Sequence, residues 1–252
     1  MKKLSLIAFA MLCFGYFSYA QDVTVKEIID NYFENTGGKD TWKSIEGLKM
    51  TSKLQQGGME LPLEIVNMKD GRQYTKINVQ GNDFFQGVYD GETLWSTNFQ
   101  SMKPEKAATE DTENHKLNIN DFPDPFLDYE SKGYTVELMG EESIDGADTY
   151  KVKLVKEPIT VDGKEIEDVS YYYFEKDAFV PLAVDNEITS GPMAGKVQRI
   201  TMSDYQEVSG VYFPFSLTQG IKDGPSQPIN MESIEVNPEV DESLFKMPES
   251  GN

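Results

Sequence analysis

The chain has 252 residues with 43 acidic and 23 basic side chains, which gives a formal net charge of −20. A protein this negative is repelled by nucleic-acid phosphates and by anionic membrane surfaces, so neither is expected as a direct partner. A solubilising surface accounts for the excess of carboxylates.

Residues 1–20 have the pattern of a secretory signal peptide. Lys2 and Lys3 provide the charged start, and the apolar run that follows is too short to cross a bilayer. Cleavage is expected after Ala20, because small residues stand there and at Ser18. The sequence therefore predicts a protein secreted to the periplasm, with a net charge of −22 once the two lysines are lost.

Cys13 offers an alternative, a lipid anchor on that cysteine. Such an anchor needs a small residue just before the cysteine, and Leu12 stands there, so the anchored form is disfavoured. If Cys13 leaves with the signal, the mature chain has no thiol. Disulfides, thiolate metal sites and cysteine nucleophiles are then excluded.

Residues 21–252 are expected to form a single domain. No linker rich in glycine, serine or proline, no block of like charge and no low-complexity tract divides them. All-β domains often reach this length as one unit.

A helix is predicted directly after the signal. Thr24 and Glu27 have the T-x-x-E spacing of a capping box, and Gly37 and Gly38 end the helical pattern. The apolar face of this helix consists of Ile28, Ile29, Tyr32 and Phe33. A second helical turn is expected around Trp42 before the first strand begins near residue 48, and together these elements resemble a lid.

From there the pattern has a period of two, as in β-strands. The first clear case is the alternation of apolar Met59, Leu61, Leu63 and Ile65 with mostly polar neighbours. Tight hairpin turns are predicted at four Asp-Gly pairs, which begin at Asp70, Asp90, Asp145 and Asp162. Repeated hairpins predict an antiparallel meander.

Residues 104–133 interrupt this rhythm. We expect a polar loop with His115, the only histidine, on the surface, and then a short helix over residues 122–129. Later strands are predicted at residues 135–138, 149–155, 169–174, 180–188, 196–204, 211–218 and 230–236. The total is about eleven strands, which is too many for a flat open sheet.

The sequence contains none of the common catalytic motifs. A G-x-S-x-G elbow, an H-E-x-x-H zinc helix, a glycine-rich phosphate loop and a dinucleotide fingerprint are all missing, so neither an enzyme nor a cofactor is expected. Asp121, Asp124 and Asp128 lack the spacing and the glycine of an EF-hand, so no metal is expected. A glycosidase stays open, because its two carboxylates can come from distant strands.

Six segments distributed over most of the mature chain resemble a known family. They are residues 32–42 (YFENTGGKDTW), 88–95 (VYDGETLW), 128–142, 171–182, 203–215 (SDYQEVSGVYFPF) and 234–248 (IEVNPEVDESLFKMP). In this order and spacing they are similar to the outer-membrane lipoprotein-sorting proteins, the LolA-like periplasmic carriers. The resemblance implies a mainly β (α+β) fold, in which a strongly curved antiparallel sheet of about eleven strands forms an unclosed half-barrel and helices cover its concave face.

The resemblance also implies a function. In the family, a hydrophobic cavity between sheet and helices holds the acyl chains of lipoproteins or lipids during transfer toward the outer membrane. The implied partners are acyl lipid or lipoprotein cargo and envelope donor and acceptor proteins, and the carrier is expected to be a monomer. The cavity arginine of the family has no assigned counterpart, since Arg72 stands in an Asp-Gly turn and Arg199 in a strand.

Side chains on one face of the predicted sheet are candidates for the cavity lining. They are Met50, Met59, Leu61, Leu63, Ile65, Phe84, Trp95, Phe126, Leu127, Tyr171 and Tyr173. Such a lining would bind without any catalytic group, because burying a methylene gains about 0.8 kcal/mol. Plain core packing accounts for these positions equally well, since alternation is expected in any half-buried sheet.

The alternative function is that of a non-catalytic envelope scaffold or sensor. Its sheet interior would be filled by its own side chains, and its loops would bind another envelope protein. A cavity of several hundred cubic ångströms, the usual scale of ligand sites, separates the two hypotheses.

Overall fold

A computed structural model describes residues 23–248 of the protein. The predicted signal peptide and Cys13 lie outside these residues. The helical elements are α1 (Val25–Asn35), α2 (Lys39–Lys43), α3 (Thr109–Asn118), η1 (Ile119–Asp121) and η2 (Glu242–Phe245). In the described part of the chain, no helix is both long enough and apolar enough to cross a membrane.

Fifteen strands are described. They are β1 (Gly47–Gln56), β2 (Met59–Met68), β3 (Gln73–Val79), β4 (Asn82–Tyr89), β5 (Leu94–Thr97), β6 (Pro104–Lys106), β7 (Thr135–Ile144), β8 (Ala147–Val155), β9 (Ile159–Val161), β10 (Lys164–Ile166), β11 (Val169–Glu175), β12 (Pro181–Glu187), β13 (Val197–Val208), β14 (Val211–Ile221) and β15 (Ser226–Val236). The strands β9 and β10 form a separate two-stranded ribbon.

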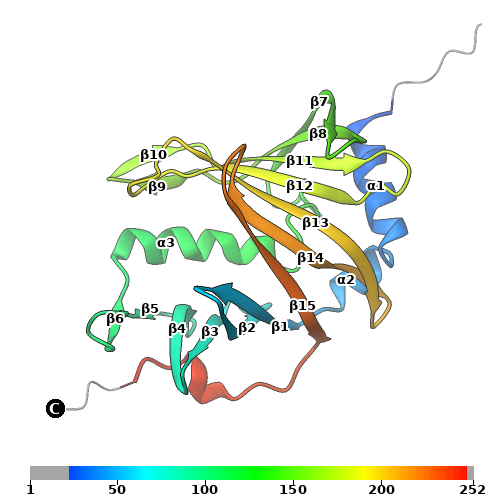
Figure 1. Cartoon of the computed structure of the whole chain (residues 1–252). Helices are drawn as coiled ribbons and strands as arrows, with labels where there is room; N and C mark the ends of the chain where they lie inside the picture. Colours follow the sequence, from blue (N-terminus) through cyan, green and yellow to red (C-terminus); the bar gives the residue numbers. More distant parts are fainter. Residues whose placement is uncertain (1–22, 249–252) are drawn as a thin grey trace, which may run out of the picture.

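The other thirteen strands form one antiparallel sheet in the order β6-β5-β4-β3-β2-β1-β15-β14-β13-β12-β11-β8-β7. The sheet curves strongly but does not close into a barrel, and the predicted mainly β half-barrel is confirmed (Figure 1). The predicted number of about eleven strands is too low. The short strands β5 and β6, of four and three residues, are too brief to show an alternation in the sequence.

The N-terminal helices form as predicted. Thr24 and Glu27 make both hydrogen bonds of the capping box, and α1 buries the four apolar residues of its predicted face. Gly37, at φ 117°, ends this element where the chain touches the turn between β13 and β14. A Cβ atom on Gly37 would lie only 2.0 Å from the carbonyl oxygen of Gly210, so this close approach requires glycine.

The middle of the chain differs from the prediction. The expected polar loop contains α3, none of whose residues is buried, while residues 122–134 form a series of turns. Because α3 has no apolar face, periodicity gave no signal for it. A helix over residues 122–129 is prevented by Pro123 and Pro125, which lack the N–H groups that a helix interior needs.

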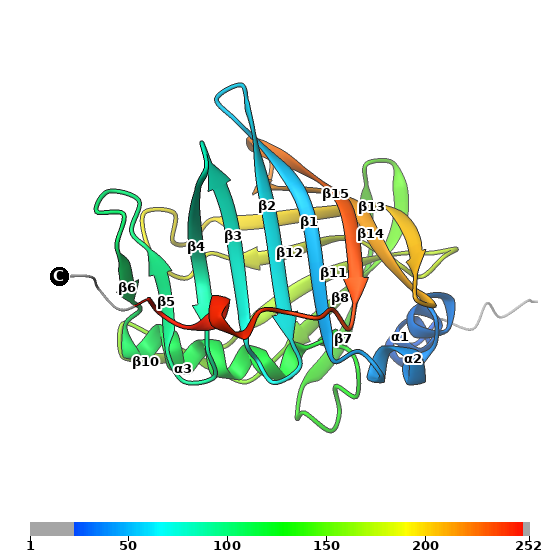
Figure 2. The ribbon, with the colours of Figure 1, turned by 90° about the horizontal axis from the view of Figure 1, so that it is seen from below.

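Apolar side chains pack on both faces of the sheet. The inner face, which we define as the face turned toward α1 and α3, carries the largest cluster together with α1, α2 and residues 126–134. The outer face is covered over β1–β5 by the C-terminal segment, which crosses it on the side opposite α3 (Figure 2). There Trp95 donates a 3.0 Å hydrogen bond to the carbonyl oxygen of Phe245.

Candidate functional site

A pocket of about 410 Å³ lies between the inner face of the sheet and residues 119–134, which we call the cap segment. Its volume falls within the usual range of small-ligand sites. The sheet contributes residues from strands as far apart as β3 and β11, since the strong curvature brings their inner faces toward one another.

Most of the pocket wall is apolar. The apolar side chains that line it are Trp42, Leu48, Met50, Met68, Ile119, Phe122, Pro123, Pro125, Pro181, Met202, Phe213 and Pro214. Three methionines and four prolines make up seven of these twelve side chains. Methionine adapts its shape to an irregular partner, so this wall suits a flexible apolar ligand.

Asp124 is one of the ionisable groups in this mostly apolar wall. Its Oδ1 accepts a 2.8 Å hydrogen bond from the backbone N–H of Phe126, and its Oδ2 accepts one of 2.9 Å from the hydroxyl of Tyr32. Burial raises the pKa of the Asp124 carboxyl to about 6, although both of these hydrogen bonds act to lower it. The carboxyl is therefore ionised at neutral pH at a considerable desolvation cost.

Three tyrosines from different elements lie near Asp124. Tyr32 comes from α1, Tyr172 from β11 and Tyr205 from β13, and all three line the pocket. Burial raises the pKa of each hydroxyl, and the charge of Asp124 raises it further. The Tyr205 hydroxyl donates to the carbonyl oxygen of Pro181 at 2.6 Å. These rings form an aromatic wall around the carboxylate.

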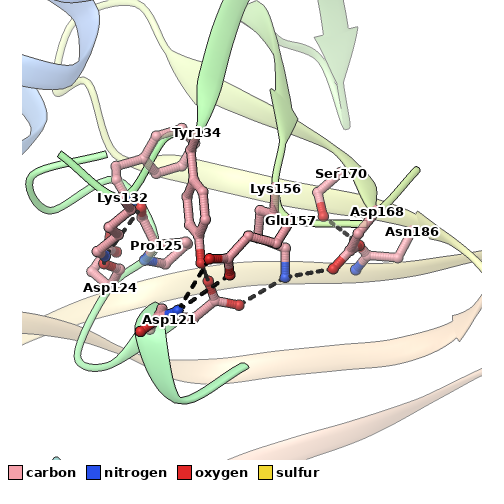
Figure 3. Close-up of polar contacts among 12 residues, drawn as sticks. Asp121, Asp124, Pro125, Lys132, Tyr134, Lys156, Glu157, Asp168, Ser170 and Asn186 are labelled. Carbon is pink, nitrogen blue, oxygen red and sulfur yellow. Dashed lines mark hydrogen bonds and ion pairs between the residues drawn. The ribbon is translucent and has the colours of Figure 1, made fainter. Parts of the chain in front are cut away.

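The cap segment is fixed to the sheet by a polar network (Figure 3). Asp121 accepts hydrogen bonds from the Tyr134 hydroxyl at 3.0 Å and from Lys156 Nζ at 2.7 Å. Lys156 also pairs with Asp168 at 2.9 Å. Because Lys156 and Asp168 flank the short β9–β10 ribbon, the network connects the cap to the far half of the sheet.

His115 lies at another part of the pocket wall. It was expected on the surface, but it belongs to α3 and packs against the ring of Tyr89 at 4.6 Å. Its Nε2 is buried and has no hydrogen-bond partner among the described residues. Burial lowers the pKa of His115, so the ring is neutral at neutral pH. The prediction was wrong because the helix that carries His115 was missed.

Arg72 borders the pocket, but its charge is engaged elsewhere. Its Nε donates to Asp70 at 2.8 Å, and its other end pairs with Glu242 of η2. The guanidinium group also lies 5.1 Å from the centre of the Phe245 ring. Arg72 therefore fastens the C-terminal segment to the sheet.

Arg199, the other arginine considered as a counterpart of the family's cavity arginine, lies on the outer face. Its guanidinium binds the nearly buried Asp185 with two hydrogen bonds of 2.6 and 2.7 Å. Asp185 also accepts bonds from Tyr173 and Lys222 at 2.8 and 2.9 Å. These donors keep the pKa of Asp185 below its usual value despite burial. The cluster ties neighbouring strands together outside the pocket.

The predicted lining residues are found in several places. Met50 lines the pocket, and Ile65 pairs with it across β1 and β2. On the same face, but outside the pocket, the register places Leu61, Leu63 and Phe84. Met59 is exposed at the end of its hairpin, and Phe126 and Leu127 are buried in the inner cluster.

Trp95, Tyr171 and Tyr173 do not face the pocket. A bulge in the β3–β4 pairing, where Gly87 has a φ of 57°, shifts the alternation and places Trp95 on the outer face. Along β11, it is Tyr172 that points inward, and its neighbours on either side point outward. We correct the prediction for these three positions accordingly.

The sequence interpretation missed Tyr172, Tyr205 and Asp124. Residues 171–174 are all aromatic, so β11 shows no alternation that would identify its inner face. Asp124 was considered only as a possible calcium ligand. The sequence did contain one signal, because Asp124 stands between Pro123 and Pro125. Two prolines so close together do not fit the interior of a helix and therefore indicate a turn at this point of the chain.

No protein-family model matches the sequence, and no curated protein matches it either. Solved structures do match. A DUF1329 family protein from Desulfovibrio piger has a TM-score of 0.52 at 15% identity, covering 88% of this chain and 97% of its own. A LolA superfamily protein from Nitrosomonas europaea has a TM-score of 0.51 at 12% identity, covering 89% and 98%.

A third match is a domain from Vibrio parahaemolyticus described as an outer membrane lipoprotein-sorting protein. Its TM-score is 0.51 at 13% identity, and the alignment covers 87% of this chain and 94% of that domain. The chain therefore has a LolA-like fold, as the resemblance in its sequence implied.

Proposed function

We propose that this protein is a carrier that binds the acyl chain of a lipid or lipoprotein in the pocket beneath the cap segment. The observation that carries the proposal is the apolar wall of a pocket of about 410 Å³ on the inner face of a LolA-like half-barrel. Each methylene that enters such a wall gains about 0.8 kcal/mol, so binding requires no catalytic group.

A chain longer than the pocket has a route along the sheet. Met50 lines the pocket, and its partner Ile65 begins a row of inner-face side chains that continues through Leu63 and Leu61. Phe84 lies beside this row, two strands further on. We propose that outward movement of the cap lets an acyl chain extend over these residues.

The proposed place of action is the periplasm, where the carrier would shuttle its cargo toward the outer membrane as a monomer. The signal-peptide pattern of residues 1–20 supports secretion. The net charge of −20 disfavours direct contact with anionic lipid surfaces, so transfer would depend on envelope donor and acceptor proteins.

The two tryptophans of the chain provide an internal test. Trp42 lines the pocket, whereas Trp95 lies on the outer face under the C-terminal segment. The variants Trp95→Phe and Trp42→Phe each retain one of them. A neutral lipid with a brominated alkyl chain, which quenches tryptophan at short range, is expected to quench Trp42 in the first variant and to leave Trp95 in the second nearly unchanged.

Equal quenching of both tryptophans, or of neither, would contradict the proposal. Mass spectrometry of organic extracts from the native protein gives an independent result, because a carrier is expected to retain acyl lipid through purification. A protein that is always empty and never quenched would favour the scaffold or sensor function instead.

A further inference from the structure

The carboxylate of Asp124 forms no ion pair within the described part of the chain. Its oxygens accept bonds from an amide N–H and from a tyrosine hydroxyl, which are both neutral donors. Lys132 lies nearby, but its Nζ donates to the backbone carbonyl oxygens of Asp124 and Pro125 at 3.1 and 3.4 Å. The negative charge in the pocket wall is thus satisfied by hydrogen bonds but not neutralised by an ion pair.

Other shielded carboxylates of the protein are arranged differently. Asp121 pairs with Lys156 at 2.7 Å, and Asp185 pairs with both Arg199 and Lys222. Buried charges are normally paired in this way, because desolvation without a counter-charge is costly. Asp124 faces a pocket instead, which leaves room for a counter-charge that comes from outside.

The surroundings of Asp124 suit an organic cation. Tyr32, Tyr172 and Tyr205 border the same part of the pocket, and ring faces attract ammonium groups. No hydrogen bond joins the Tyr172 hydroxyl to another of residues 23–248. Aromatic walls of this kind recognise ammonium groups in proteins, and a carboxylate adds a charge-assisted hydrogen bond to such a group.

An anionic head group finds no comparable site. Arg72 is the cationic residue of the pocket wall, and its guanidinium is already bound by Asp70 and Glu242. A carboxylate or phosphate in the pocket would also meet the negative charges of Asp121 and Asp124. Fatty acids and phosphate esters are therefore disfavoured.

We propose that the pocket selects an amphiphile with an ammonium head, which binds at Asp124 among Tyr32, Tyr172 and Tyr205 while its hydrocarbon tail lies along the apolar wall. This inference rests on the proposed function, since it assumes that the pocket holds the tail. It adds the chemical class of the ligand, an amine-headed lipid.

The test compares ligands that share one tail. Decylamine, decanol and decanoate are titrated at pH 7.5 into the Trp95→Phe variant, with Trp42 fluorescence as the readout. Decylamine is expected to bind about tenfold more tightly than decanoate, with decanol between them. Lysophosphatidylethanolamine forms a fourth arm, and its binding relative to decylamine tells whether the amine belongs to a phospholipid or to a lipid without phosphate.

Matched variants distinguish the effect of the Asp124 site on binding from the effect of the protein's overall negative charge. Asp124→Asn is expected to reduce the preference for decylamine over decanoate to less than about threefold. Asp223→Asn, on an exposed turn, makes the same change in net charge and is expected to leave the preference intact. Tyr172→Leu removes one aromatic ring of the site. This variant is expected to weaken the binding of decylamine more than the binding of decanol.

The outcomes distinguish the two proposals. Equal binding of all three decyl compounds would overturn the ammonium inference and leave the carrier function standing. A preference lowered equally by Asp124→Asn and Asp223→Asn would also overturn it. If no compound binds, the carrier function itself fails.

Discussion

The hydroxyl of Tyr32 donates a 2.9 Å hydrogen bond to Oδ2 of Asp124, and this bond joins the first helix to the cap segment 92 residues later in the chain. Both residues line the pocket. The bond therefore links the helix to the cap at the wall of the pocket, in an apolar environment where hydrogen bonds are strong and their loss is costly.

Replacing Tyr32 by phenylalanine keeps the ring and removes only this contact. The carboxylate of Asp124 then loses one of its two donors, and we expect the free energy of unfolding to fall by about 1 to 3 kcal/mol. Urea denaturation measures the change. Tyr212→Phe is the control, because the Tyr212 hydroxyl is exposed and has only a 3.5 Å contact with Glu207; equal losses in the two variants would contradict the role of the Tyr32 bond.

Asp124 is expected to make stability depend on pH in an unusual direction. Its pKa is raised from 3.8 to about 6, so the folded state holds the proton more tightly than the unfolded state. Its contribution to the free energy of unfolding is fully present below about pH 4 and is lost as the pH rises through about 6, by on the order of 3 kcal/mol. The charged and titratable groups that face it are Tyr32 from α1, Asp121 and Lys132 from the cap segment, Tyr172 from β11 and Tyr205 from β13.

Asp124→Asn removes this titration. Between pH 4 and pH 7.5, we expect the wild type to lose stability relative to the variant, as measured by urea unfolding of both proteins at each pH. Comparison with Asp223→Asn subtracts the effect of net charge. A difference between wild type and Asp124→Asn that stays constant with pH would disprove the raised pKa.

The C-terminal segment is expected to stabilise the outer face through Phe245. This ring is 1% exposed and packs with Val66, Tyr74 and Trp95. Phe245→Ala is expected to cost about 3 to 5 kcal/mol and to shift the emission of Trp95 to longer wavelength, since the indole becomes hydrated. Phe99→Ala, at a ring that is 57% exposed, should cost less than about 1 kcal/mol, and a similar cost in both variants would argue against the packing role.

Gly87 is expected to be required by the bulge that turns Trp95 outward. At a φ of 57°, a Cβ atom on Gly87 would have only an ordinary contact, 3.7 Å from Gln73 Nε2, so any cost comes from the backbone. Gly87→Ala should therefore lose about 1 kcal/mol in thermal or urea unfolding, and Gly87→Asn should lose less, because asparagine tolerates this conformation. If alanine is accepted without loss, the backbone conformation given for the bulge is wrong.

Local signals in the sequence predicted much of the fold. The capping box at Thr24 and Glu27 and the two glycines after it correctly placed the first helix, since capping depends only on neighbouring residues. The four Asp-Gly pairs mark turns between strands, as predicted; Asp145 and Asp162 have positive φ there. Helix α3 could not be predicted in this way, because its residues are exposed or only partly buried and show no apolar periodicity.

The pocket was harder to predict than the strands around it. Met50 lies on the inner face and lines the pocket, but Tyr172 was passed over in favour of Tyr171 and Tyr173. When a strand carries aromatic residues on both faces, alternation does not tell which face is inward. A bulge of one residue also moves every later side chain of the strand to the opposite face. The lining therefore depends on register, which is a property of strand pairs and not of single strands.

Local patterns in the sequence were sufficient to predict a mainly β protein with an N-terminal helix, regular hairpins and LolA-like segments, because caps, turns and alternation act over a few residues. Which side chains meet in the pocket depends instead on how distant segments pack in three dimensions. Tyr32, Asp124, Tyr172 and Tyr205 come from four distant parts of the chain. The curvature of the sheet and the packing of the cap bring them together, and these arise from long-range contacts that no local pattern encodes.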